Sequence, residues 1–135
     1  MRVYIAGRYG RKLEFRDVAD TLRRRGIVVT SRWLQESNSP DSQMGEDSPE
    51  FYARCAAVDL EDIETADALL FFAEDPLVGI PRGGRHVEFG YGLARGKYID
   101  VVGPRENVFH YVSPLVRHWD TFEFYLNANH VEVSG

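Results

Sequence analysis

Residues 68 to 73 read ALLFFA, an apolar run between a long candidate helix and a loop that contains Pro and Gly. A short, wholly apolar run predicts a strand that is buried on both faces of a sheet. The same pattern recurs as RVYIA at 2 to 6, GIVVTS at 26 to 31 and YIDVVG at 98 to 103. These segments therefore predict four buried strands, and a short fifth strand is expected near 116 to 118.

Helical patterns separate the predicted strands. Apolar residues recur at helical spacing after the first strand, and Gly26 ends that pattern. Ser48 with the proline that follows it is a typical helix start, and this helix is expected to run to about Thr65. Further helices are expected before Gly96 and at about 121 to 129. Strands alternating with helices predict an α/β fold, a parallel sheet of about five strands covered on both faces.

The length and composition fit one domain, residues 1–135, in a cytoplasmic protein. No apolar run approaches the ~18 residues that span a bilayer, and no signal-peptide core precedes the first charges. Cys55 is the only cysteine, which excludes an intrachain disulfide and fits a reducing compartment. The net charge of -5 argues against binding of a nucleic acid polymer. The histidines have no metal-ligand spacing, so we expect no metal and no cofactor.

The loops after the strands are the expected ligand site, because ligands of parallel sheets bind outside the carboxyl ends of the strands. Arg8 and Arg11 follow the first strand and leave a small anionic ligand possible. Trp33 begins the long polar loop after the second strand and is the expected anchor of that loop. Asp100 interrupts the fourth strand, and the sequence offers no reason for it.

Two carboxylates stand out by position. At 100° per residue, Asp59 falls in the middle of the apolar stripe of its helix, where burial tends to raise a pKa. It either caps a loop amide or is a general acid at a pocket wall. Glu88 follows Gly83 and Gly84 near the start of another helix, where the helix dipole favours an ionised carboxylate. One charged and one protonated carboxylate would form a nucleophile and acid arrangement.

Three segments in order resemble a known family. VYIAG at 3 to 7, DLEDIETADALLFF at 59 to 72 and GGRHVEFGYGLARGKYIDVVG at 83 to 103 are similar to successive motifs of the nucleoside 2-deoxyribosyltransferases. That family includes the 2'-deoxynucleoside 5'-monophosphate N-hydrolases. The resemblance implies a flavodoxin-like fold and cleavage of the N-glycosidic bond of a 2'-deoxynucleoside or its monophosphate, a reaction of nucleotide salvage.

The resemblance also implies roles for single residues. Glu88 matches the nucleophile that takes the deoxyribosyl group at C1', and Asp59 matches the acid near the leaving base. Tyr4 matches the tyrosine that holds the nucleophile through its hydroxyl. These roles agree with the physical case for both carboxylates, because covalent catalysis splits one difficult displacement into two.

Substrate-binding residues are implied in the loops. Gly7, Arg8 and Arg11 lie where the hydrolases of the family bind phosphate, although GRYGRK at 7 to 12 departs from their serine-containing loop, and the arginines are otherwise solvated charges. Gly83 and Gly84 allow the backbone to approach a sugar, although a Gly-Gly pair alone is a weak signal.

More distant candidates complete the implied site. Trp33 either stacks on a base or anchors its loop. Asn107 and His110 are candidates for the sugar 5' end, in a segment that would reach a neighbouring subunit; the alternative is a polar loop with one buried Phe. A homodimer or higher homo-oligomer with shared active sites is therefore implied.

Three functions remain open at this point. A transferase would exchange bases through a deoxyribosyl-Glu88 intermediate, whereas an N-hydrolase would resolve the same intermediate with water. The third is a nucleotide-binding module without chemistry. Tyr4, Asp59 and Glu88 together count against that module, since a binder needs neither an acid nor a nucleophile.

Overall fold

The computed structural model describes residues 1–35, 48–75, 83–112 and 114–129. The first half of the sheet is a β-α-β unit: β1 (Arg2–Ala6) leads through the 3-10 helix η1 (Tyr9–Arg11) and α1 (Lys12–Arg24) to β2 (Val28–Val29). The second half contains η2 (Arg32–Gln35), α2 (Pro49–Glu64), β3 (Ala68–Phe72), α3 (Gly84–Ala94), β4 (Tyr98–Val102), η3 (Val108–Tyr111), β5 (Val116–Trp119) and α4 (Phe122–Asn129).

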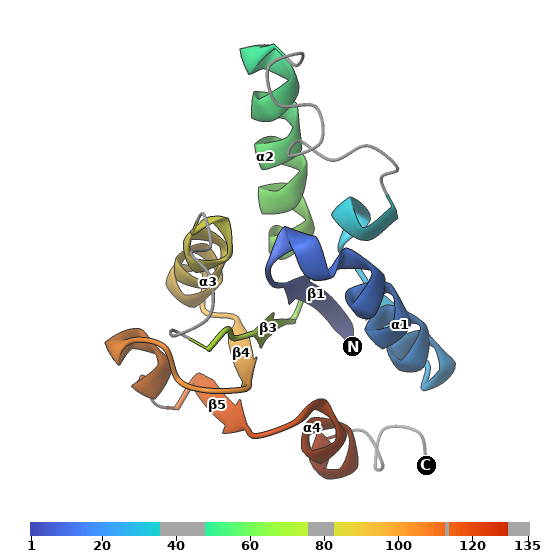
Figure 1. The fold of residues 1–135 in the computed structure, drawn as a ribbon, viewed down its shortest axis with the longest axis vertical. Helices are drawn as coiled ribbons and strands as arrows, with labels where there is room; N and C mark the ends of the chain where they lie inside the picture. The colour runs from blue at the N-terminus through green and yellow to red at the C-terminus, as the bar shows by residue number, and fades with distance from the viewer. Residues whose placement is uncertain (36–47, 76–82, 113, 130–135) are drawn as a thin grey trace.

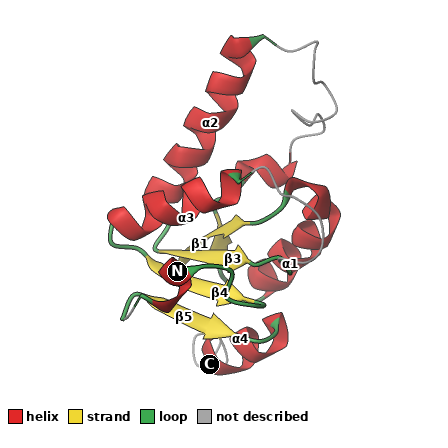
Figure 2. Cartoon of the chain, turned by 60° about the vertical axis from the view of Figure 1, so that its left-hand side comes forward, coloured by secondary structure: helices red, strands yellow, loops and turns green. Residues whose placement is uncertain are grey.

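All five strands are parallel, in the order β2-β1-β3-β4-β5, and helices cover both faces of the sheet (Figures 1 and 2). This strand order is that of the flavodoxin-like fold, so the predicted fold class is confirmed. None of the helices within the described ranges is long and apolar enough to cross a membrane.

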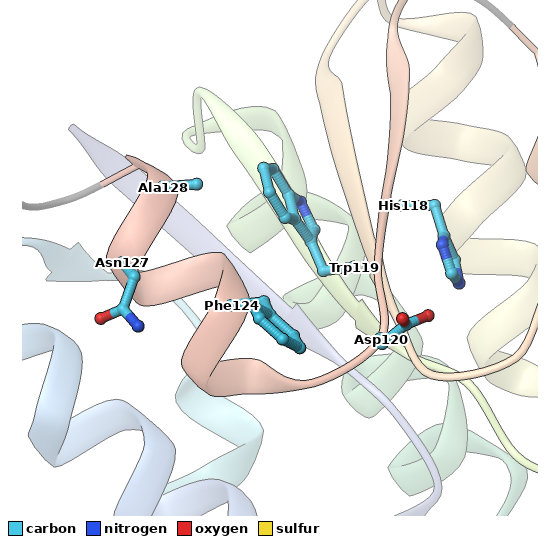
Figure 3. Close-up of a pocket in the computed structure, with 6 residues that line it drawn as sticks. All are labelled: His118, Trp119, Asp120, Phe124, Asn127 and Ala128. Carbon is cyan, nitrogen blue, oxygen red and sulfur yellow. The ribbon is translucent and has the colours of Figure 1, made fainter.

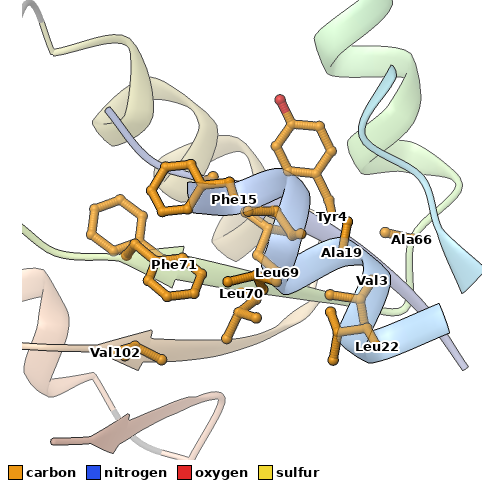
Figure 4. Close-up of a cluster of buried hydrophobic side chains, with 14 of the residues drawn as sticks. Val3, Tyr4, Phe15, Ala19, Leu22, Ala66, Leu69, Leu70, Phe71 and Val102 are labelled. Carbon is orange, nitrogen blue, oxygen red and sulfur yellow. The ribbon is translucent and has the colours of Figure 1, made fainter. Parts of the chain in front are cut away.

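The core forms because β3 is apolar along its whole length (Figure 4). Alternate side chains of a strand point to opposite faces, so neighbouring phenylalanines of β3 serve different layers. Phe71 packs edge-on against Phe89 of α3, whereas Phe72 contacts Phe15 of α1 and Phe122 of α4. The apolar run that predicted the fold thus binds both helical layers to the sheet.

The second strand is shorter than predicted. Gly26 has a φ of 81° and turns the chain after α1. Beyond β2, the side chains of Thr30 and Ser31 bind backbone groups: Thr30 Oγ1 donates to the carbonyl of Asp62, and Ser31 Oγ accepts the N–H of Ile5 at 2.6 Å. Side-chain hydrogen bonds thus replace part of the ladder, and residues 36–47 of the following loop lie outside the described ranges.

Asp100 has a structural explanation. It is 2% exposed in β4 and faces Arg117 of β5, its partner in the strand register. Its carboxylate accepts hydrogen bonds from Arg117 Nη2 at 3.0 Å and from Trp119 Nε1 at 2.9 Å. Because a buried carboxylate is costly unless it is paired, these two donors account for an acid in an otherwise apolar strand.

Candidate active site

Tyr4, in the middle of β1, contacts Glu88 of α3. Tyr4 lies in β1, fully buried, and its hydroxyl points out of the core cluster (Figure 4). This hydroxyl donates a short hydrogen bond to Oε2 of Glu88, the fifth residue of α3. Two groups that are 84 residues apart in the chain are thereby joined by the fold.

The protonation of Glu88 differs from the prediction. Burial raises the pKa of Glu88 from 4.5 to about 8; the hydrogen bond from Tyr4 opposes this rise, and the charge of Asp59 adds to it. Burial, together with the charges of Glu88 and Asp59, also raises the pKa of Tyr4 well above 10. The expectation of an ionised Glu88 is therefore wrong for neutral pH, whereas Tyr4 stays a hydrogen-bond donor.

Asp59 is the third member of this group. It lies on α2, partly exposed, and its charge acts on the pKa of both Tyr4 and Glu88. The fully buried acid of α2 is instead Asp62, which accepts hydrogen bonds from the N–H of Arg32 at 2.9 Å and from Arg32 Nε at 2.8 Å. Asp62, one helical turn after Asp59, thus binds the start of the loop after β2.

The glycines of the predicted site differ in what surrounds them. Gly83 has a φ of 91° and precedes α3, and an added Cβ on Gly83 or Gly84 meets no atom of the described residues within 4 Å. Both therefore leave room for a ligand to approach the backbone. A Cβ on Gly7 would lie 2.4 Å from the ring of Phe15, so that glycine is required by core packing.

Arg11 is held inside the protein rather than solvated. It donates to Glu14 at 2.6 Å and to Glu74 at 2.5 Å, and these contacts raise the pKa of its guanidinium despite partial burial. The guanidinium also lies 4.9 Å from the centre of the Phe15 ring. Arg8 is more exposed, with a nitrogen 4.0 Å from Glu74.

Trp33 serves as the anchor of its loop. It is 7% exposed, and its indole N–H donates to the carbonyl of Ile5 at 3.0 Å. Its ring lies beside those of Tyr9 and Phe15. A ring this buried has no free face for a base, so the structure supports anchoring over stacking.

Asn107 and His110 are engaged within their own segment. Asn107 caps η3 by accepting the N–H of Phe109 at 2.9 Å. His110 is 2% exposed, and its Nδ1 accepts the N–H of Glu106 at 3.0 Å. Burial lowers the pKa of His110 to about 4, so its ring is neutral at pH 7. The Nε2 of His110 is buried without a hydrogen-bond partner among the described residues.

A buried ion pair near α3 escaped the sequence analysis. Arg85, in the first turn of α3, donates two hydrogen bonds to the carboxylate of Glu106, and the side chains are 2% and 9% exposed. Glu106 also accepts the N–H of Glu74 at 2.8 Å. It therefore ties the end of β3, the start of α3 and the loop after β4 together. No local pattern in the sequence links residues so far apart.

A pocket lies at the β5 edge of the sheet, away from Tyr4, Asp59 and Glu88 (Figure 3). It has a volume of about 440 Å³ and is lined by His118, Trp119, Asp120, Phe124, Asn127 and Ala128. It contains none of the predicted site residues. Among the residues described, no cluster of three or more His, Cys, Asp or Glu could hold a metal ion.

Comparisons with known proteins agree with this architecture. No family model and no curated protein matches the sequence. Among solved structures, a 2-deoxyribosyltransferase from Bacillus psychrosaccharolyticus is 17% identical, with a TM-score of 0.74 over 98% of this chain and 96% of that one. A CMP N-glycosidase from Clostridium botulinum is 19% identical, with a TM-score of 0.61 over 94% and 96%. A 2-desoxiribosyltransferase from Leishmania mexicana is 16% identical, with a TM-score of 0.56 over 96% and 98%.

The chain has the flavodoxin-like fold of these enzymes. At such low identity, the likeness concerns the fold, and function has to be argued from the site itself.

Proposed function

We propose that this protein cleaves the N-glycosidic bond of a 2'-deoxynucleoside, or of its 5'-monophosphate, through a deoxyribosyl intermediate on Glu88. The observation that carries the proposal is the hydrogen bond from Tyr4 to Glu88, with Asp59 close enough to act on the pKa of both. The fold is shared with two deoxyribosyltransferases and an N-glycosidase, which supports the same class of bond.

The reaction takes two displacements at C1'. In the first, the Glu88 carboxylate attacks C1' while the bond to the base nitrogen breaks, and the bonding electrons leave with the base. Asp59 gives its proton to that base, and Tyr4 orients the nucleophile by its hydrogen bond. In the second, a free base or water attacks C1', passes a proton to Asp59 and releases the Glu88 carboxylate. Two displacements retain the configuration at C1'.

Transfer to another base is the leading form of the proposal, and hydrolysis is its alternative, because the same carboxylates serve both. Incubation with a deoxynucleoside, with and without a second free base, separates the two forms. An exchanged nucleoside supports transfer, whereas free deoxyribose or its 5-phosphate alone supports hydrolysis. Tight binding without release of any base would support a nucleotide-binding module instead.

The covalent step is tested by mass spectrometry of the intact protein after mixing with a panel of deoxynucleosides and their monophosphates. Wild type should gain the mass of one deoxyribosyl group, and peptide mapping should place it on Glu88. Glu88→Gln should show no adduct and no turnover, while its melting curve still shows a folded protein. Glu123→Gln, a change of the same kind at an exposed position of α4, is the control and should behave as wild type.

The proposal includes a homodimer or higher homo-oligomer with shared active sites. It is supported by the outer face of η3, where Val108, Phe109 and Tyr111 are 75%, 60% and 66% exposed. Exposed apolar patches of this kind mark interaction surfaces. Light scattering should give a mass above one chain, and Phe109→Asp should lower both that mass and the activity. A fully active monomer would contradict this part of the proposal.

A further inference from the structure

Glu74 sits where two arginines of a neighbouring loop converge. It follows the end of β3, and its side chain is only 12% exposed. Because β1 and β3 are adjacent strands, Glu74 lies beside the loop that follows β1. One of its carboxylate oxygens is 2.5 Å from Arg11 Nη1 and the other is 4.0 Å from Arg8 Nη1.

Arg11 is fixed from several sides and is poorly placed to hold a second anion. Glu14 binds it through Nε and Nη2 at 2.8 and 2.6 Å, while Glu74 takes Nη1. Its guanidinium also lies over the rings of Phe15 and Phe72, at 4.9 and 5.6 Å from their centres. A phosphate that bound Arg11 would have to break ion pairs that already satisfy its donors.

Apart from Arg8, which is 45% exposed, and Lys12, whose Nζ donates to the Tyr9 hydroxyl at 2.9 Å, the described surroundings offer little further positive charge. Arg85 is buried and bound in a bidentate pair by Glu106. Asp59 adds an acid near the reacting group, whereas Glu88, with a pKa of about 8, keeps its proton at pH 7. A phosphate monoester would bring a further charge of about -1.5 to -2 at pH 7. Like charges in a partly buried site repel strongly, because water screens them less there.

The short segment after β1 connects the reacting group to the surroundings of Glu74. Arg8 follows Tyr4 by four residues, which is at most about 13 Å of extended chain at 3.3 Å per residue. We therefore infer that a sugar with its C1' near Glu88 directs its 5' end toward the loop of Arg8 and the Glu74 side chain beside it. The charge of Glu74 then acts at the 5' end, where a nucleoside carries a hydroxyl and a nucleotide carries a phosphate.

We infer that Glu74 is a specificity-determining residue that selects an uncharged 5' end, so that the ligand is a 2'-deoxynucleoside and not its monophosphate. The inference rests on the proposed function for the placement of C1'. Glu74 neutralises the cations that a phosphate would need and repels the phosphate itself. A 5'-hydroxyl, which is neutral and can donate to a carboxylate, meets neither obstacle.

The test compares the four common 2'-deoxynucleosides with their 5'-monophosphates. Binding is measured by calorimetry, and base release is measured separately by chromatography. Wild type should bind the nucleosides at least about tenfold more tightly, the equivalent of about 1.4 kcal/mol. Glu74→Gln should tighten monophosphate binding by about tenfold, change nucleoside binding less than about twofold, and lose much of its gain at high salt.

Two further variants separate specificity from a structural effect. Glu74→Asp keeps the charge and should keep the discrimination. Glu123→Gln makes the same change of charge at an exposed position of α4, so the ratio should stay at the wild-type value. Tighter binding of monophosphates by wild type, or an equal effect of Glu74→Gln on both ligands, would overturn the inference. Because binding decides it, a failure to release base counts against the proposed function alone.

Discussion

The strongest test of the proposed site asks whether Glu88 or Asp59 carries the single proton that the proposed chemistry assigns to this pair. The proposed chemistry needs Glu88 ionised and Asp59 protonated. With a pKa of about 8, Glu88 keeps a proton at pH 7, so the reactive arrangement is a minor form of the pair. The hydroxyl of Tyr4 stabilises the Glu88 carboxylate and thereby increases the share of that minor form.

Tyr4→Phe removes this hydroxyl and leaves the ring in the core. A hydrogen bond to a charged group contributes about 1.5 to 3 kcal/mol, which corresponds to one to two pKa units. The pKa of Glu88 should therefore rise further above 8, and the share of the reactive form should fall. We expect base release to drop by about 10- to 100-fold between pH 6 and pH 8.

The assay is the pH dependence of kcat/KM for base release, from pH 5 to pH 10. Wild-type activity should fall above about pH 8, because the pair then loses the proton that Asp59 must donate. In Tyr4→Phe this alkaline fall should begin one to two pH units higher, on a lower profile. Tyr91→Phe is the matched control: Tyr91 donates to Glu64 at 2.7 Å in a partly buried hydrogen bond that does not involve Glu88, and its loss should leave the profile unchanged.

Two results would refute this reasoning. A loss below about threefold in Tyr4→Phe would mean that the hydroxyl does not stabilise the reactive form, given the 1.5 to 3 kcal/mol expected of such a bond. A wild-type profile that rises through pH 8 and then stays level would mean that Glu88 needs no partner acid, which would remove Asp59 from the mechanism.

Three further variants and one control test other parts of the site. Asp59→Asn should lose about 10²-fold or more in rate with poor leaving bases and less with good ones; an equal loss for all bases, measured by initial rates, would contradict an acid. Because folding raises the pKa of Glu88, the free energy of unfolding of wild type should fall as the pH rises from about 4.5 to about 8. Glu88→Gln removes this titration, so it should unfold at a higher urea concentration than wild type at pH 9 but not at pH 4. Glu106→Gln should lower the free energy of unfolding by about 3 kcal/mol because it leaves a buried guanidinium unpaired. Glu61→Gln, which breaks an exposed ion pair, should cost less than about 1 kcal/mol in the same urea titration.

The fold was predictable because its signals are local. A strand buried on both faces has to be apolar at every position, and ALLFFA at 68 to 73 satisfies that requirement without reference to the rest of the chain. The start of α2 is equally local, since Ser48 accepts the N–H of Phe51 as a helix cap. The second strand was overestimated because Thr30 and Ser31 bind backbone groups that only the folded chain brings to them.

The site was predictable only where a residue's position decides its surroundings. The spacing along α2 predicted that Asp59 faces the core. It did not show that Asp62 would be the more buried acid, because burial along α2 is confined to the end of the helix at Asp62 and Ile63. The engagement of Arg11 by Glu74 and of Arg85 by Glu106 could not be foreseen. Each pair joins segments that become neighbours through strand order, which no periodicity records.

The protonation of Glu88 shows which of two physical effects is larger. A helix N-terminus stabilises a carboxylate by about 0.3 to 1 kcal/mol, and this effect fades beyond the first turn. Glu88 is the fifth residue of α3 and therefore lies beyond that turn. Burial acts on the whole charge, and a pKa of about 8 instead of 4.5 corresponds to several kcal/mol at about 1.4 kcal/mol per unit. Burial therefore determines the protonation of Glu88. It also has a consequence for the proposed chemistry, because a carboxylate that water does not stabilise gains more free energy by forming a bond to C1'. In the proposed mechanism, the burial that makes Glu88 costly as an ion is therefore what suits it to attack C1'.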